Sequence, residues 1–174
     1  AMSASPAVVG AAIASHVNGR DWDDPELAMV LEAAQARGAL LFVHPAAVRT
    51  AGVLSRYHLG NLIGNPVETT TAIACLIFGG VLDRFPRLRF VFAHGGGYAA
   101  FAAGRFDHGK VVRPEAAAAA LDPSAYLGRL YFDSLTHSHA ALRYLVEVVG
   151  ADHVLLGSDD PADMGRPDSA RWVC

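Results

Sequence analysis

Arg89-Phe90-Val91-Phe92-Ala93-His94-Gly95-Gly96-Gly97 is the most informative stretch of this 174-residue sequence. The apolar residues 90–93 predict a short strand that is buried on both faces, as in a parallel sheet. His94 follows directly, at the strand end where α/β proteins place their chemistry. The glycines lack side chains, so a ligand could approach the backbone there. On this stretch alone, a hydrogen-bonded core histidine followed by a flexible turn is the alternative interpretation.

Other apolar segments predict four more strands, namely Val8–Ser15, Leu40–Val43, Leu130–Phe132 and Val154–Leu156. Helices between them are predicted by the N-cap residues Asp24, Asn65 and Ser138 and by apolar positions at helical spacing. These helices are expected over 24–38, 65–82, 98–110, 114–121 and 138–149. Strands that alternate with helices in this way predict an α/β fold, in which helices pack outside a parallel sheet.

Polar residues follow the predicted strands at their carboxyl ends, which lie at one edge of a parallel sheet. They are His44, His94, Asp133 and Asp159. Imidazole nitrogens and carboxylate oxygens bind divalent transition metals, so His44, His94 and Asp159 are candidate ligands. A histidine that lies near a metal without binding it can act as a general acid or base. The loop of about twenty residues before Asn65 is either a wall of such a site or a solvated excursion.

Composition excludes several classes of partner. The net charge is −3, with 14 basic and 17 acidic residues and no basic cluster, which argues against nucleic acid or anionic lipid. The longest apolar run, 72–82, is too short to span a membrane. Cys75 and Cys174 form neither a metal-type spacing nor a disulfide framework, as is usual in a reducing cytoplasm. We therefore expect a cytoplasmic protein that contacts neither nucleic acid nor membrane.

Five motifs occur in a recognisable order along residues 8–161. They are Val43-His44-Pro45, Gly64-Asn65-Pro66-Val67-Glu68-Thr69-Thr70, Phe85-Pro86, Ala93-His94-Gly95-Gly96-Gly97 and Gly157-Ser158-Asp159-Asp160-Pro161. As a set they resemble the amidohydrolase-related family typified by aminocarboxymuconate-semialdehyde decarboxylase. The resemblance implies a metal-dependent (β/α)₈ TIM barrel that usually holds Zn²⁺ and sometimes Mn²⁺.

The same resemblance implies roles for four residues of this chain. His44 and Asp159 would be metal ligands, and His94 would be the nearby acid or base. Arg105 would reach a neighbouring subunit's site and pair with a substrate carboxylate, which implies a homo-oligomer, a dimer in the full-length form. A guanidinium fork suits bidentate carboxylate binding. The alternative for Arg105 is a surface arginine paired with Asp107 or Glu115.

The sequence also departs from the family pattern. The family's first strand carries a His-x-His pair, whereas the pair found here, His137-Ser138-His139, is expected to begin a helix. A complete barrel usually has about 250 residues, and the five predicted strands match its last five. We therefore expect residues 1–174 to form a single incomplete barrel domain that lacks the first three strands, with an irregular tail at 162–174. Asp160 stands where the family usually has an aromatic residue.

Three functions are compatible with these features. The first is a metal-dependent decarboxylase that acts on a small unsaturated or aromatic carboxylic acid. Arg105 favours it, because a decarboxylase must bind a carboxylate. The second is a metal-dependent hydrolase that opens a lactone or an amide, and the third is an inactive truncated fragment with exposed sheet edges.

Overall fold

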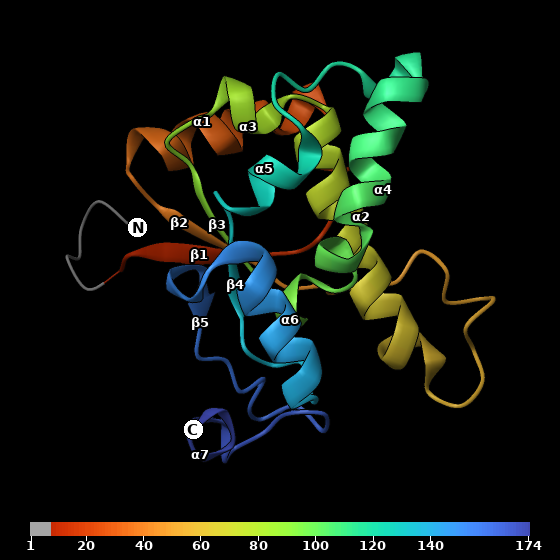
Figure 1. Cartoon of the computed structure of the whole chain (residues 1–174), viewed down its shortest axis with the longest axis vertical. Coiled ribbons are helices and arrows are strands. Elements are labelled where there is room, and N and C mark those ends of the chain that lie inside the picture. Colours follow the sequence, from red (N-terminus) through yellow and green to blue (C-terminus); the bar gives the residue numbers. More distant parts are fainter. Residues whose placement is uncertain (1–7) are drawn as a thin grey trace.

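A five-stranded parallel sheet forms the centre of the computed structural model, which describes residues 8–174 (Figure 1). The strands lie in chain order as β1 (Gly10–Ile13), β2 (Leu40–Val43), β3 (Arg89–Phe92), β4 (Tyr131–Asp133) and β5 (Val154–Leu155). Leu41, for example, pairs with Ala11 on one side and Phe90 on the other. All carboxyl ends therefore lie at one edge, as predicted, while β1 and β5 are the two open edges of the sheet.

Aromatic side chains fix the centre of the sheet. Phe90, Phe92 and Phe132 are each fully buried. Their ring centroids lie 6.0 Å apart between Phe90 and Phe92, and 6.2 Å apart between Phe92 and Phe132. Aromatic pairs at such distances stabilise a core beyond the effect of area burial. The packing holds the ends of β3 and β4 in place, directly before the polar residues that follow them.

Seven α-helices accompany the strands in the described part of the chain: α1 (Ala28–Ala36), α2 (Asn65–Phe78), α3 (Val81–Arg84), α4 (Ala99–Val112), α5 (Pro123–Leu127), α6 (His139–Val149) and α7 (Ser169–Val173). Helices α2, α4 and α5 pack against one another, and α4 also contacts α6 (Figure 1). Within residues 8–174, no helix has both the length and the apolar character that crossing a membrane requires.

The predicted helix signals act mostly as expected. Asp24 accepts a hydrogen bond from the N–H of Glu26 at 2.9 Å, in a 3₁₀ turn that leads into α1. Ser138 caps α6 by accepting from the N–H of Ala141 at 3.3 Å. Asn65, predicted as a cap, is instead part of α2, because a π-helical turn at Gly60–Gly64 continues directly into that helix.

One predicted helix is wrong. The predicted helix over 114–121 is only a 3₁₀ turn at Pro114–Ala116, because side chains bind the backbone beyond it. Asp83 accepts from the N–H of Ala120, and Lys110 donates to the carbonyl of Leu121.

The tail 162–174 is not wholly irregular, because it contains α7. Trp172 on α7 stacks on His139, with ring centroids 4.5 Å apart, and the guanidinium of Arg166 lies 4.9 Å from the Trp172 ring. These tertiary contacts hold a helix too short for sequence periodicity to reveal. The single domain 1–174 stays a prediction, and its first seven residues lie outside the described residues.

Candidate active site

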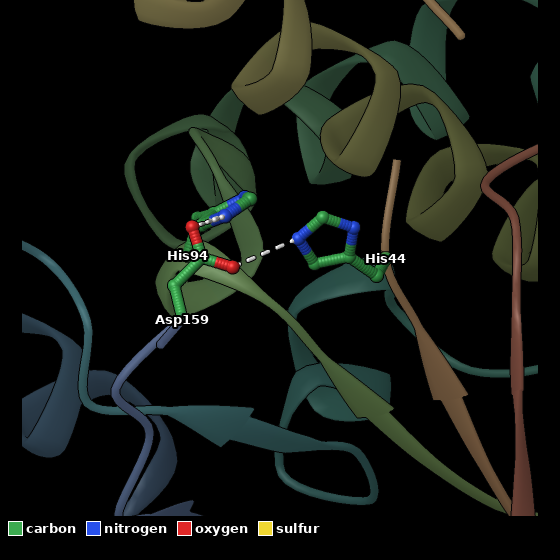
Figure 2. A group of neighbouring side chains, drawn as sticks. All are labelled: His44, His94 and Asp159. Carbon is green, nitrogen blue, oxygen red and sulfur yellow. Dashed lines mark hydrogen bonds and ion pairs between the residues drawn. The ribbon is translucent and has the colours of Figure 1, made fainter. Parts of the chain in front are cut away.

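His44, His94 and Asp159 converge at the carboxyl edge of the sheet, and Figure 2 shows their side chains pointing toward one another. The Nε2 atom of His44 lies 3.2 Å from Oδ1 of Asp159, and Nε2 of His94 lies 3.6 Å from Oδ2 of the same carboxylate. The two imidazole centroids are 5.0 Å apart. The structure therefore brings together two predicted metal ligands and the predicted acid–base histidine.

Two of these residues have a left-handed backbone conformation. His94 has φ 56° and Asp159 has φ 54°, a region that costs non-glycine residues roughly 1–3 kcal/mol. His94 begins a 3₁₀ turn that ends at Gly96, and the glycines allow this turn to pack tightly. A Cβ atom on Gly96 would lie 2.5 Å from the ring of Phe132, and one on Gly97 would overlap the carbonyl oxygen of Pro66. The glycines are thus needed for contacts within the protein, rather than for ligand approach alone.

Asp133 holds the turn that carries His94. The carboxylate is 6% exposed, and its Oδ1 accepts from the N–H of Gly95 at 2.9 Å and from that of Leu135 at 3.1 Å. Burial raises the pKa of Asp133, while the hydrogen bonds from the backbone act in the opposite direction. Asp133 therefore positions the site and does not belong to the group of metal-binding candidates.

His94 is the most strongly desolvated of the three converging side chains. Burial lowers the pKa of His94, and neighbouring His44 lowers it further, while the carboxylates of Asp133 and Asp159 oppose the shift. The imidazole is therefore neutral near pH 7, with Nε2 toward Asp159. Its Nδ1 is buried and makes no hydrogen bond within residues 8–174. A neutral imidazole can accept a proton or bind a metal.

The donor atoms fit a divalent metal ion. One ligand atom from each of His44, His94 and Asp159 lies within 4.8 Å of the others. Two ligands that each stand about 2.1 Å from one ion lie roughly 3.0–3.5 Å apart. The 3.2 Å between His44 and Asp159 matches that separation, and the 3.6 Å to His94 exceeds it slightly. Nitrogen and carboxylate donors suit zinc or manganese.

A cavity of about 670 Å³ opens beside these residues. Aromatic and apolar side chains dominate its wall, and His94 and Asp159 contribute polar atoms to it. Its lining includes Asn61, Leu62, Asn65, Pro66, Tyr98, Phe101, Leu135, Thr136, His137, Tyr144, Leu145 and Met164. The end of the loop between β2 and α2 thus forms part of the wall, which was one of the two predicted interpretations of that loop.

Arg105, predicted to bind a substrate carboxylate, lies outside this cavity. It is exposed on α4 and is not among the residues that line the site of its own chain. Neither alternative partner pairs with it, because Asp107 accepts from the N–H of Ser124 and Glu115 pairs with Arg113. His137, in contrast, lines the cavity, although the sequence favoured the start of a helix there over contact with the site.

A buried charged cluster close to this edge was not predicted. Glu68 on α2 is 2% exposed and accepts from the backbone N–H of Arg49 at 2.7 Å and from its Nε at 2.9 Å. Arg49 also pairs with Asp21 at 2.9 Å, and His16 lies 3.8 Å from Glu68. The sequence signal was an acidic residue in a helix that is apolar nearly all round, which requires a partner when buried.

Known proteins match this chain in sequence. The amidohydrolase family model matches residues 2–173. The 2-amino-3-carboxymuconate-6-semialdehyde decarboxylases of Dictyostelium discoideum and Caenorhabditis elegans are 41% identical over 159 residues and 39% identical over 137 residues. These matches cover 90% and 77% of this chain, and 44% and 34% of the relatives.

Among solved structures, the 5-carboxyvanillate decarboxylase from Sphingomonas paucimobilis superposes with a TM-score of 0.81 at 35% identity. The match covers 88% of this chain and 48% of that enzyme. The chain thus spans about half the length of the relatives it matches, and its five parallel strands form a partial TIM barrel. The family model, the identities and the shared fold together show that the chain belongs to the amidohydrolase family.

Proposed function

We propose that this chain carries the metal and acid–base groups of a metal-dependent decarboxylase. Its substrate would be a small unsaturated or aromatic carboxylic acid. The observation that carries the proposal is the convergence of His44, His94 and Asp159 beside a cavity walled by aromatic side chains. The three relatives described above, each more than 30% identical, are decarboxylases by name, which favours loss of carbon dioxide over hydrolysis.

His44 and Asp159 would hold the metal through one nitrogen and one oxygen. A bound divalent cation supplies Lewis-acid stabilisation of negative charge on substrate oxygens. Zinc and manganese both suit these donors. A 5-carboxyvanillate decarboxylase from Novosphingobium aromaticivorans with the same fold has manganese bound, so manganese belongs beside zinc in any test.

His94 would move the proton. Its Nε2 faces the metal-binding edge, and burial keeps the imidazole neutral near pH 7. In decarboxylation it would deliver a proton to the carbon that loses carbon dioxide, after taking it up from solvent or substrate. Tyr98 and Phe101 offer flat surfaces beside this position, as a conjugated substrate requires.

Arg105 would complete the site of a second copy of this chain. It shares one face of α4 with Phe101, His108 and Val112, which follow each other at helical spacing and are all exposed. Phe101 is 84% exposed and Val112 is 50% exposed. An apolar stripe around an arginine is typical of a protein interface, so we place the dimer contact on α4.

The α4 contact predicts that Phe101→Glu separates the two copies. A carboxylate placed in an apolar contact costs binding free energy, because it must be desolvated without a partner. Sedimentation velocity is expected to show a dimer for the wild-type chain and a monomer for Phe101→Glu. The matched change Val53→Glu, on an 86% exposed loop residue, leaves the dimer intact. A wild-type monomer, or a dimer that survives Phe101→Glu, contradicts the proposed contact.

The function itself is tested with purified chain supplied with Mn²⁺ or Zn²⁺ and a panel of aromatic and unsaturated acids. We expect stoichiometric metal binding and release of carbon dioxide that stops when a chelator removes the metal. Asp159→Asn should reduce both, because it removes a carboxylate ligand. Ring opening of lactones or amides without gas would identify a hydrolase instead. Bound metal without turnover of any compound would indicate an inactive fragment.

A further inference from the structure

His137 has a backbone conformation that costs free energy, which indicates that its side chain has a function. It lies in the turn between β4 and α6 with φ 54°, in the left-handed region where glycine would be unstrained. The side chain is exposed and lines the cavity together with His94 and Asp159. Four imidazoles in residues 8–174 lie within 4.0 Å of a carboxylate, and His137 is not one of them.

The cavity has few groups that could bind an acidic oxygen. No lysine or arginine of residues 8–174 lines it. His94 faces Asp159, and the hydroxyl of Tyr144 donates to the carbonyl of Ala100 at 3.3 Å. Asn61 and Asn65 are neutral. His137 is therefore the lining histidine whose ring N–H can donate to an acidic oxygen without already facing a carboxylate.

One carboxylate holds the backbone next to His94 and the backbone that leads to His137. Oδ1 of Asp133 accepts from the N–H of Gly95, directly after His94, and from the N–H of Leu135, two residues before His137. The turn is closed by a hydrogen bond from Thr136 Oγ1 to the carbonyl of Ser138 at 3.0 Å. Both imidazoles thus stand on backbone held by the same buried group, as a binding site of defined length requires.

We infer that His137 is a specificity-determining residue that binds a second acidic oxygen substituent of the substrate, remote from the carboxylate lost in the reaction. The inference rests on the proposed function. A planar acid that lies against the aromatic wall would have one end at the His44–Asp159 edge and the other at His137. Substrates with two acidic groups, such as dicarboxylates, would then bind more tightly than simple monocarboxylates.

Calorimetric titration of the Mn²⁺-supplied chain with benzene-1,3-dicarboxylate and with benzoate tests this. For His137→Ala we expect the Kd of the dicarboxylate to rise about tenfold or more, since a charge-assisted hydrogen bond is lost, while that of benzoate changes less than about twofold. His137→Gln, which keeps an N–H donor, should recover part of the loss. His58→Ala, which changes an exposed histidine that does not line the cavity, is the matched control.

A second readout is the NMR resonance of the His137 imidazole, which should shift on addition of the dicarboxylate and not of benzoate. If both probes weaken equally in the two His137 variants, or neither weakens, His137 has no such role, while carboxylate binding at the site stands. If the wild-type chain binds neither probe, the proposed function fails, and the inference fails with it.

Discussion

Replacing His94 by glutamine is expected to lower the rate of decarboxylation by about 10²- to 10⁴-fold, the range for loss of a positioned acid or base. The amide of glutamine keeps a polar group at the end of β3 but cannot exchange a proton near neutral pH. Affinity for Mn²⁺ should stay within about threefold, because the metal would be held by His44 and Asp159. Single-turnover kinetics and metal titration measure the two quantities separately.

The same variant distinguishes acid–base catalysis from metal ligation, since His94 lies close enough to Asp159 for either role. If His94 is a ligand, metal affinity and rate should fall together in His94→Gln. His58→Gln changes an exposed histidine that does not line the cavity and should leave both quantities unchanged. A rate that survives in His94→Gln would remove this residue from the mechanism.

The order and direction of the strands were predictable because parallel strands buried on both faces are short continuous apolar runs. Leu40–Val43 was predicted to the residue, whereas β1 and β5 are shorter than predicted. Both are edge strands, so each has a neighbouring strand on one side only. Local pattern marks a strand, but pairing decides where it ends.

The convergence of His44, His94 and Asp159 was predictable from their shared place after strands. The wall of the cavity was not, because Phe101 and Tyr144 lie on helices whose rotation depends on tertiary packing, and Tyr98 directly precedes one of them. Arg105 illustrates the same limit. Its role was implied by resemblance, and within a single chain it lies on the surface, away from the site.

Removal of the Glu68 carboxylate by substitution with alanine is expected to lower the free energy of unfolding by about 3–5 kcal/mol, the cost of breaking a buried ion pair. The backbone N–H and the guanidinium of Arg49 would both lose their acceptor, and only Asp21 would remain to pair with Arg49. The loss of the acceptor for these Arg49 donors outweighs the small gain in side-chain entropy.

The buried cluster also anchors the loop that leads from β2 to the cavity wall. Glu68→Ala should therefore destabilise this loop as well as the whole fold. Urea titration gives the free energy of unfolding, and hydrogen exchange over residues 46–64 should rise in Glu68→Ala. Glu26→Ala is the matched control. Glu26 is 72% exposed and its partner Arg20 is 46% exposed, so their ion pair should contribute less than about 1 kcal/mol to the free energy of unfolding. Equal effects from the two variants would mean that water compensates for the buried carboxylate. Arg49 would then stabilise the loop through packing rather than through charge.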